Sequence, residues 1–266
     1  MSVAHVRGIE MAYEEAGAGE PALVLLHGFP FNRSMWREQV AALGARRRVI
    51  TPDLRGHGET SATEEAATME ALAQDVASLL DELRVERAVI GGLSMGGYVT
   101  LAFYRLFPAR VRALVLADTR ATPDTEEARR VREETAEKAL KDGMSGIADA
   151  MLPKLVAPAT LKGRPEIVAR VREMIERTNP QGAAEALRGM ALRRDQTEML
   201  ARIDVPTLIL VGDADQLTPP KDSEMMHALV RGSHLVVIEG AGHVSNLERP
   251  AEFNRALAEF LDALEG

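Results

Sequence analysis

The chain has 266 residues, of which 46% are hydrophobic and 27% charged, a composition typical of a folded globular protein and not of a disordered or fibrous one. Its 40 acidic and 32 basic residues give a net charge of −8, which argues against a protein that coats nucleic acid. Cysteine is absent, so disulfides, thiolate catalysis and iron–sulfur clusters are excluded. The amino-terminal residues lack a secretory pattern, and the aliphatic stretch nearest to them is too short to span a bilayer. We therefore expect a cytoplasmic protein that does not enter a membrane.

Six short apolar runs, each bounded by turn residues, predict buried strands of a parallel sheet. They are residues 21–26, 49–51, 88–91, 113–117, 207–211 and 234–238. Apolar residues at helical spacing predict helices between most of these strands, at 68–83 with Thr68 as the N-cap, at 96–107 and at 251–264. Strands that alternate with helices predict an α/β fold with a doubly wound, mostly parallel sheet.

The alternation stops between residues 122 and 200, where no strand-like run occurs. Prolines divide this segment into about four predicted helices: Pro123, Pro153, Pro158, Pro165 and Pro180. A helical insert of this length between two strands predicts a lid over the carboxyl edge of the sheet. The chain would then consist of a core, residues 1–121 and 201–266, and a lid, residues 122–200. A packing subdomain without a gating role is the alternative.

The motif GLSMG at residues 92–96 directly follows the predicted strand 88–91 and opens the helix 96–107. This strand–turn–helix context is typical of a nucleophile elbow, in which glycines on either side of the serine let the strand and the helix approach closely. Ser94 would lie at the amino end of the helix, where free N–H groups favour an oxyanion. We predict that Ser94 is a nucleophile; a serine that merely caps the helix is the alternative.

A serine nucleophile needs a base, which the sequence offers at His243, after the strand at 234–238 and a glycine-bearing turn. From this loop an imidazole can reach over the sheet edge toward Ser94. A purely structural histidine is the alternative. The other five histidines fit better as residues of a terminus, a helix, a strand or glycine-containing loops that they order: His5, His227, His234, His27 and His57.

The carboxylate that orients the imidazole is predicted in the loop that follows the strand at 207–211. We assign Asp215, which lies deep in this turn before a helix that starts at the two prolines 219–220. Asp213 is interpreted as a turn residue that bonds its own backbone. Asp118, at the end of the strand 113–117, is a rival because that strand end faces the same edge of the sheet.

Ser94, Asp215 and His243 occur in the chain order of α/β-hydrolases, and the sequence resembles this superfamily over essentially its full length. The motifs that carry the resemblance are HGFP at 27–30, DLRGHG at 53–58, GLSMGG at 92–97, GDAD at 212–215 and GH at 242–243. The resemblance implies an α/β-hydrolase fold and an oxyanion hole formed by the backbone N–H groups of Phe29 and Met95. The side chains of these two residues would line the pocket.

Within the superfamily, the motifs resemble small carboxylesterases and enol-lactonase-like members, which implies that water hydrolyses a small ester or lactone through an acyl-enzyme. The retained His27–Gly28 pair and the electrically neutral lid favour uncharged esters over a 3-oxoadipate enol-lactone. A perhydrolase, a C–C bond hydrolase and a ligand receptor on a hydrolase scaffold are alternatives, whereas Ser94 argues against relatives with an aspartate nucleophile. Acyl length and oligomeric state are left open.

Neither a metal site nor a cofactor is expected. Asp213 and Asp215 share one turn but lack the further ligands that a hard cation needs, and no dinucleotide fingerprint follows the first strand. Four lid methionines are candidates for an adaptable apolar pocket wall: Met144, Met151, Met174 and Met190.

Overall fold

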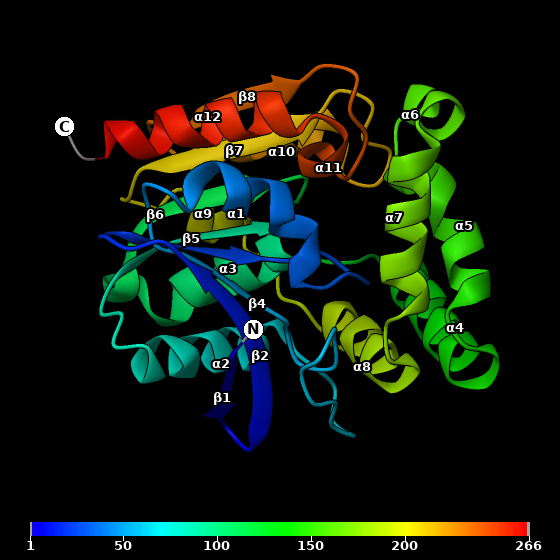
Figure 1. Ribbon diagram of the computed structural model, residues 1–266. Coiled ribbons are helices and arrows are strands. Elements are labelled where there is room, and N and C mark those ends of the chain that lie inside the picture. The colour runs from blue at the N-terminus through cyan, green and yellow to red at the C-terminus, as the bar shows by residue number, and fades with distance from the viewer. Residues whose placement is uncertain (1, 265–266) are drawn as a thin grey trace.

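Eight strands form one sheet in the order β1-β2-β4-β3-β5-β6-β7-β8 in the computed structural model, which describes residues 2–264 (Figure 1). The six predicted strands form its parallel part: β3 (Ala22–Leu26), β4 (Val49–Pro52), β5 (Ala88–Leu93), β6 (Val111–Ala117), β7 (Thr207–Gly212) and β8 (His234–Ile238). Two strands that the sequence did not predict, β1 (Ser2–Val6) and β2 (Ile9–Ala16), add an antiparallel hairpin next to β4. The predicted α/β fold with a mostly parallel sheet is confirmed.

Helices cover both faces of the sheet, which is why every residue of β3, β5 and β7 is buried. One face carries α1 (Arg37–Leu43) and α12 (Pro250–Ala263), which pack against each other, and the other carries α2 (Met69–Glu82) and α3 (Met95–Leu106). As predicted, the Thr68 side chain caps α2 by accepting the Ala71 N–H.

The chain reverses its winding direction at β3. It leaves β3 through α1 for β4 on one side and returns through α2 to β5 on the other. The carboxyl ends of β3 and β5 therefore lie side by side, with Leu26 paired to Gly92. In doubly wound sheets this switch point is where ligands bind.

The segment between β6 and β7, residues 122–200, holds six helices where about four were predicted. They are α4 (Glu126–Asp142), α5 (Ser145–Leu155), α6 (Pro158–Gly163), α7 (Pro165–Glu176), α8 (Pro180–Ala191) and α9 (Thr197–Leu200). Three of the prolines start helices as expected, but Pro153 lies inside the end of α5 and does not divide it. In Figure 1 the helices α4 to α8 stand beside the sheet, at the ends of its strands. We refer to residues 122–200 as the helical insert.

Helix α8 packs its backbone directly against the core at two glycines, which are seven residues apart. A Cβ added to Gly182 would lie 1.8 Å from the carbonyl oxygen of Gly56, and one added to Gly189 would lie 1.9 Å from that of Ala67. Ala67 also donates its N–H to the carbonyl of Glu185 on α8 (3.1 Å). The helix backbone thus rests directly on backbone of the core.

His27 and His57 order the loops after β3 and β4, as the sequence suggested. Leu54 donates its N–H to Nε2 of His27 (2.9 Å), so His27 carries its proton on Nδ1, 2.9 Å from the carbonyl oxygen of Gly28. His57 likewise places Nδ1 3.0 Å from the carbonyl oxygen of Arg55. Burial lowers the pKa of His27 to about 4 and, together with the nearby His27, that of His57 to about 3.

These lowered pKa values predict that acid destabilises the fold. Below about pH 6.5 these histidines bind protons in the unfolded chain but stay neutral in the folded one. Their contribution to the free energy of unfolding is therefore fully present above that pH and falls as the pH drops toward 4. The expected slope is up to about 1.4 kcal/mol per pH unit for each histidine. Urea unfolding at pH 7, 6 and 5 should show a shallower slope for His57→Gln than for the exposed control His5→Gln. Equal slopes in these two variants would contradict the prediction.

Candidate active site

Ser94 occupies a sharp turn between β5 and α3. Its φ of 55° and ψ of −113° are a strained combination for a residue with a side chain. Glycines make the turn possible because they let α3 approach two strands closely: a Cβ on Gly92 of β5 would lie 2.2 Å from the Gly96 backbone, and one on Gly96 would lie 2.1 Å from the carbonyl oxygen of Leu26 on β3. The residues that the sequence singled out around Ser94 thus form a strand–turn–helix.

The structure brings Ser94, His243 and Asp215 together from three different loops. Nε2 of His243 lies 2.8 Å from Oγ of Ser94, and Nδ1 of His243 lies 2.8 Å from Oδ2 of Asp215. His243 and Asp215 are buried, and Ser94 is partly exposed. This geometry lets an imidazole take the proton of a serine hydroxyl while a carboxylate fixes the ring.

The Asp215 carboxylate is held by three further donors. Oδ1 accepts the N–H groups of Leu217 (2.8 Å) and Thr218 (2.9 Å), and Oδ2 accepts the hydroxyl of Thr218 (2.6 Å). Burial alone acts to raise the pKa of Asp215, but the charge of His243 and these hydrogen bonds outweigh it and hold the pKa below its usual value. Asp215 is therefore ionised and oriented. Thr218 was not among the residues predicted from the sequence, because its contact with Asp215 depends on how the loop folds.

The two other aspartates considered from the sequence serve different partners. Oδ1 of Asp213 accepts the N–H groups of Gly240 (2.8 Å) and Ala241 (3.3 Å), so the interpretation that it bonds its own turn is wrong. Asp118 accepts the N–H of Gly212 (2.9 Å) and the hydroxyl of Ser245 (2.5 Å).

Asp118 is fully buried at the end of β6 and shows no hydrogen bond to His243 in the described part of the chain. Burial and the negative charge of Asp215 raise the pKa of its carboxyl well above the usual value. The structure thus places Asp215, not its rival, against the imidazole.

Phe29 and Met95 follow β3 and Ser94 at the switch point of the sheet. Among residues 2–264 neither backbone N–H has a protein acceptor, so both amides are available to a ligand. The Phe29 side chain lines the cavity that contains Ser94. The Met95 side chain is fully buried and does not line it, so the expectation that both side chains face the pocket is half wrong.

Ser94 and His243 open into a cavity of about 500 Å³ between the core and the helical insert. Core residues form its floor: Phe29, Ser94, Tyr98, Leu217, Thr218 and His243. Apolar side chains of α4, α5 and α8 form much of its wall: Ala128, Val131, Ile147, Ala150, Met151, Leu187 and Met190. Two of the four candidate methionines are thus present, whereas Met144 and Met174 are buried elsewhere.

All charged side chains among the described residues that line this cavity are basic: Arg120, Arg132, Lys138 and Lys154. Arg132 forms an ion pair with Asp124, and Arg120 forms an ion pair with Asp222 (3.5 Å) and donates to the carbonyl of Leu217. Neither lysine has a hydrogen-bond or ion-pair partner within residues 2–264. The insert is neutral as a whole, and only three of its fourteen basic residues line the cavity. Because no acidic side chain among the described residues lines it, the cavity nevertheless presents positive charge beside Ser94, which a charge count over the whole insert does not show.

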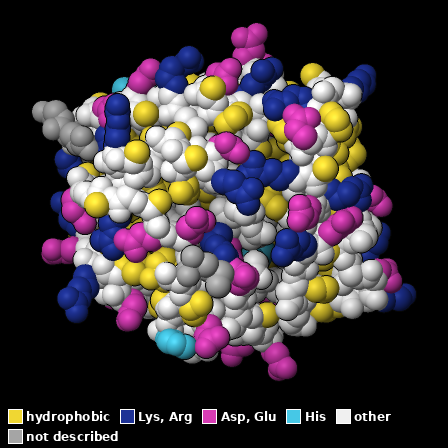
Figure 2. Space-filling view, in the orientation of Figure 1, with side chains coloured by type: hydrophobic (Ala, Val, Ile, Leu, Met, Phe, Trp, Pro, Cys, Tyr) yellow, Lys and Arg dark blue, Asp and Glu magenta, His cyan; other side chains and the backbone are white. Residues whose placement is uncertain are grey.

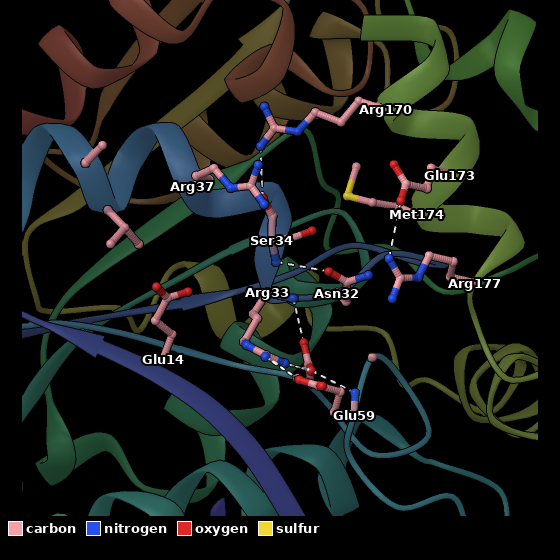
Figure 3. A pocket seen from close by; sticks show the side chains of 14 residues that line it. Glu14, Asn32, Arg33, Ser34, Arg37, Glu59, Arg170, Glu173, Met174 and Arg177 are labelled. Carbon is pink, nitrogen blue, oxygen red and sulfur yellow. Dashed lines mark hydrogen bonds and ion pairs between the residues drawn. The ribbon is translucent and has the colours of Figure 1, made fainter. Parts of the chain in front are cut away.

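A second cavity, of about 660 Å³, lies between α1, α7 and the loops after β3 and β4 and shares no lining residue with the first (Figure 3). Its charges largely neutralise one another. Arg33 pairs with Asp53 and Glu59, and Arg177 lies 3.3 Å from Glu173. The cavity is a polar junction between the insert and the core.

No helix within residues 2–264 is long and apolar enough to cross a membrane. Nor do three or more histidine, aspartate or glutamate side chains in this range form a group that could hold a metal ion.

Comparison with known proteins places this geometry in context. The sequence profile described as the alpha/beta hydrolase family matches residues 23–256. The chain is 31% identical to 3-oxoadipate enol-lactonase 1 of Acinetobacter baylyi over 245 residues, which are 92% of this chain and 90% of that protein.

Solved structures agree with the sequence match. A thermophilic esterase from Thermogutta terrifontis, solved with malate bound, superposes with a TM-score of 0.97 at 40% identity and covers 100% of this chain and 99% of its own. The enol-lactonase from Burkholderia xenovorans superposes with a TM-score of 0.92 at 31% identity, over 98% of this chain and 100% of its own.

Proposed function

The chain belongs to the alpha/beta hydrolase family, and from this premise we propose that it is a serine hydrolase that cleaves small carboxylic esters. The observation that carries the proposal is the pair of 2.8 Å contacts that joins Ser94 to His243 and His243 to Asp215. Its similarity to an esterase and to enol-lactonases supports a carboxylic ester hydrolase.

In the proposed mechanism, Nε2 of His243 takes the proton of Ser94 while Oγ attacks the ester carbonyl. Asp215 keeps the other imidazole proton on Nδ1 and stabilises the imidazolium that forms. The N–H groups of Phe29 and Met95 receive the oxyanion. His243 then protonates the leaving alcohol and activates a water molecule, which releases the acid from Ser94.

The helical insert is proposed to act as a lid. It supplies most of the wall around Ser94, so substrate reaches the serine between insert and core. In this scheme water is the second substrate, and the three side chains and two backbone amides carry every step without a cofactor.

Steady-state turnover of a short p-nitrophenyl ester tests the proposal. Sustained hydrolysis supports an enzyme, whereas a single burst without later turnover would indicate a ligand receptor on a hydrolase scaffold. A perhydrolase or a C–C bond hydrolase would show poor ester turnover but good turnover with peroxide as the acyl acceptor or with a diketone substrate.

The cavity also favours a second candidate, a lactonase or esterase whose substrate carries a carboxylate. Four basic side chains and no acidic one line the cavity among the described residues, and two of the four lack partners. A negative group on the substrate would therefore meet a favourable potential beside the serine. The malate bound to the similar esterase is a small organic acid, consistent with this candidate.

Removing the unpaired charges separates the two candidates. For Lys138→Met and Lys154→Met we expect kcat/KM for a carboxylate-bearing ester to fall about three- to tenfold, and that for a neutral ester of equal size to stay unchanged. Lys141→Met, on the same helix as Lys138 but outside the cavity, is the control. If the two variants change kcat/KM equally for both esters, the second candidate fails and a neutral ester, as predicted from the sequence, is the substrate.

A further inference from the structure

The loop that carries His243 is tied to the helical insert through one buried carboxylate. Glu248, the last residue of α11 (Ser245–Glu248), is only 1% exposed. Its Oε1 accepts the N–H of Gly242 (2.7 Å), the residue before His243. Its Oε2 accepts the N–H of Ala157 (2.9 Å), which lies in the connection between α5 and α6.

Backbone contacts reinforce this tie on the other side of the histidine. Val244, the residue after His243, donates its N–H to the carbonyl of Leu155 at the end of α5 (3.2 Å). A Cβ on Gly242 would lie 2.6 Å from the nitrogen of Ala157, so these two backbones are in direct contact. Both chain neighbours of His243 are therefore bonded to residues 155–157 or to the carboxylate that holds them.

The chemistry of position 248 requires a carboxylate. Two N–H groups point at its two oxygens, and only an ionised carboxyl accepts on both. A glutamine would satisfy one N–H and turn its own NH₂ group toward the other. Burial raises the pKa of Glu248, and the hydrogen bonds from Thr160, Ala157 and Gly242 oppose this by favouring the ionised form.

We propose that Glu248 is a positioning residue that holds loop 240–244 and segment 155–157 as one unit, so that the insert sets His243 in register with Ser94. The inference rests on the proposed role of His243 as the base. Lys154 and Met151 of α5 line the cavity just before this segment. A substrate that contacts α5 and fixes its position would therefore also align the imidazole of His243.

The test is Glu248→Gln, compared with Glu259→Gln, which removes the same charge from an exposed position on α12. For Glu248→Gln we expect kcat to fall about 10- to 100-fold with KM nearly unchanged, because a small misplacement of the base affects the reaction and not binding. The downfield NMR resonance of the His243 Nδ1 proton should shift or broaden in this variant only. Wild-type kcat and an unchanged resonance would overturn the inference.

Hydrogen exchange tests the coupling without reference to activity. In Glu248→Gln the backbone amides of segments 155–157 and 240–244 should both exchange faster, whereas faster exchange in 240–244 alone would overturn the proposal. If that variant does not fold, native-state exchange of the wild-type protein in rising denaturant replaces it. The amides of Ala157, Gly242 and Val244 should then open with one common free energy, and separate values would overturn the coupling. A failure of the proposed function would instead appear as undiminished activity in His243→Ala.

Discussion

Replacing Ser94 by alanine is expected to lower kcat for a short ester by at least about 10³-fold and to leave the fold intact. The substitution deletes the attacking oxygen, which lies 2.8 Å from the imidazole, but keeps the Cβ and the strained backbone of the turn. Steady-state kinetics gives the loss of rate, and thermal unfolding checks that the protein is folded.

Ser223→Ala is a matched control for this measurement. Ser223 is a buried serine of α10 (Pro220–Leu229) whose hydroxyl has no partner among the described residues. This variant should retain full activity. If Ser94→Ala stays within tenfold of the wild-type rate, another group is the nucleophile.

Asp215→Asn is expected to lower kcat by about 10²- to 10⁴-fold. An asparagine keeps the shape of the side chain, but it can present its NH₂ group to Nδ1 of His243 and so favour the tautomer that cannot accept the serine proton. The N–H groups of Leu217 and Thr218 also lose a charged acceptor. The pH-independent kcat of the purified variant measures the effect.

Asp118→Asn and Asp213→Asn provide the comparison, because both carboxylates bond groups other than the imidazole. Their kcat values should fall much less than that of Asp215→Asn. If kcat falls strongly in Asp118→Asn and only slightly in Asp215→Asn, the carboxylate that orients His243 is Asp118, at the end of β6.

The parallel part of the sheet was predictable because burial on both faces leaves continuous apolar runs in the sequence. The hairpin of β1 and β2 was not, since its strands mix buried with exposed residues and contain no such run. Pro153 misled the division of the insert because it lies only two residues before the end of α5, so the backbone hydrogen bond that it removes affects the last turn alone.

The residues around Ser94 were predictable for a similar reason, since a tight turn imposes glycines at fixed spacing. Contacts between segments that are far apart in the chain produce no comparable pattern in the sequence, so they could not be predicted. The bond from Ala157 to Glu248 spans 91 positions, and Thr218 supports Asp215 only once the loop has folded. Charge is the clearest example. Equal numbers of acidic and basic residues make the insert neutral in the sequence, but its folded helices place Lys138 and Lys154 at the wall of the cavity.

The backbone contact between α8 and the core limits which parts of the helical insert can be exchanged, in evolution or by engineering. Helix α4 and the part of α5 before Leu155 line the cavity through side chains, which can change to suit a new substrate. Helix α8 meets residues 56 and 67 through its backbone at Gly182 and Gly189, so even a methyl group there would push it away. A graft that imports another insert onto this scaffold should therefore keep α8 with both of its glycines, keep segment 155–157 that bonds the loop of His243, and vary the cavity-facing positions of α4 and α5.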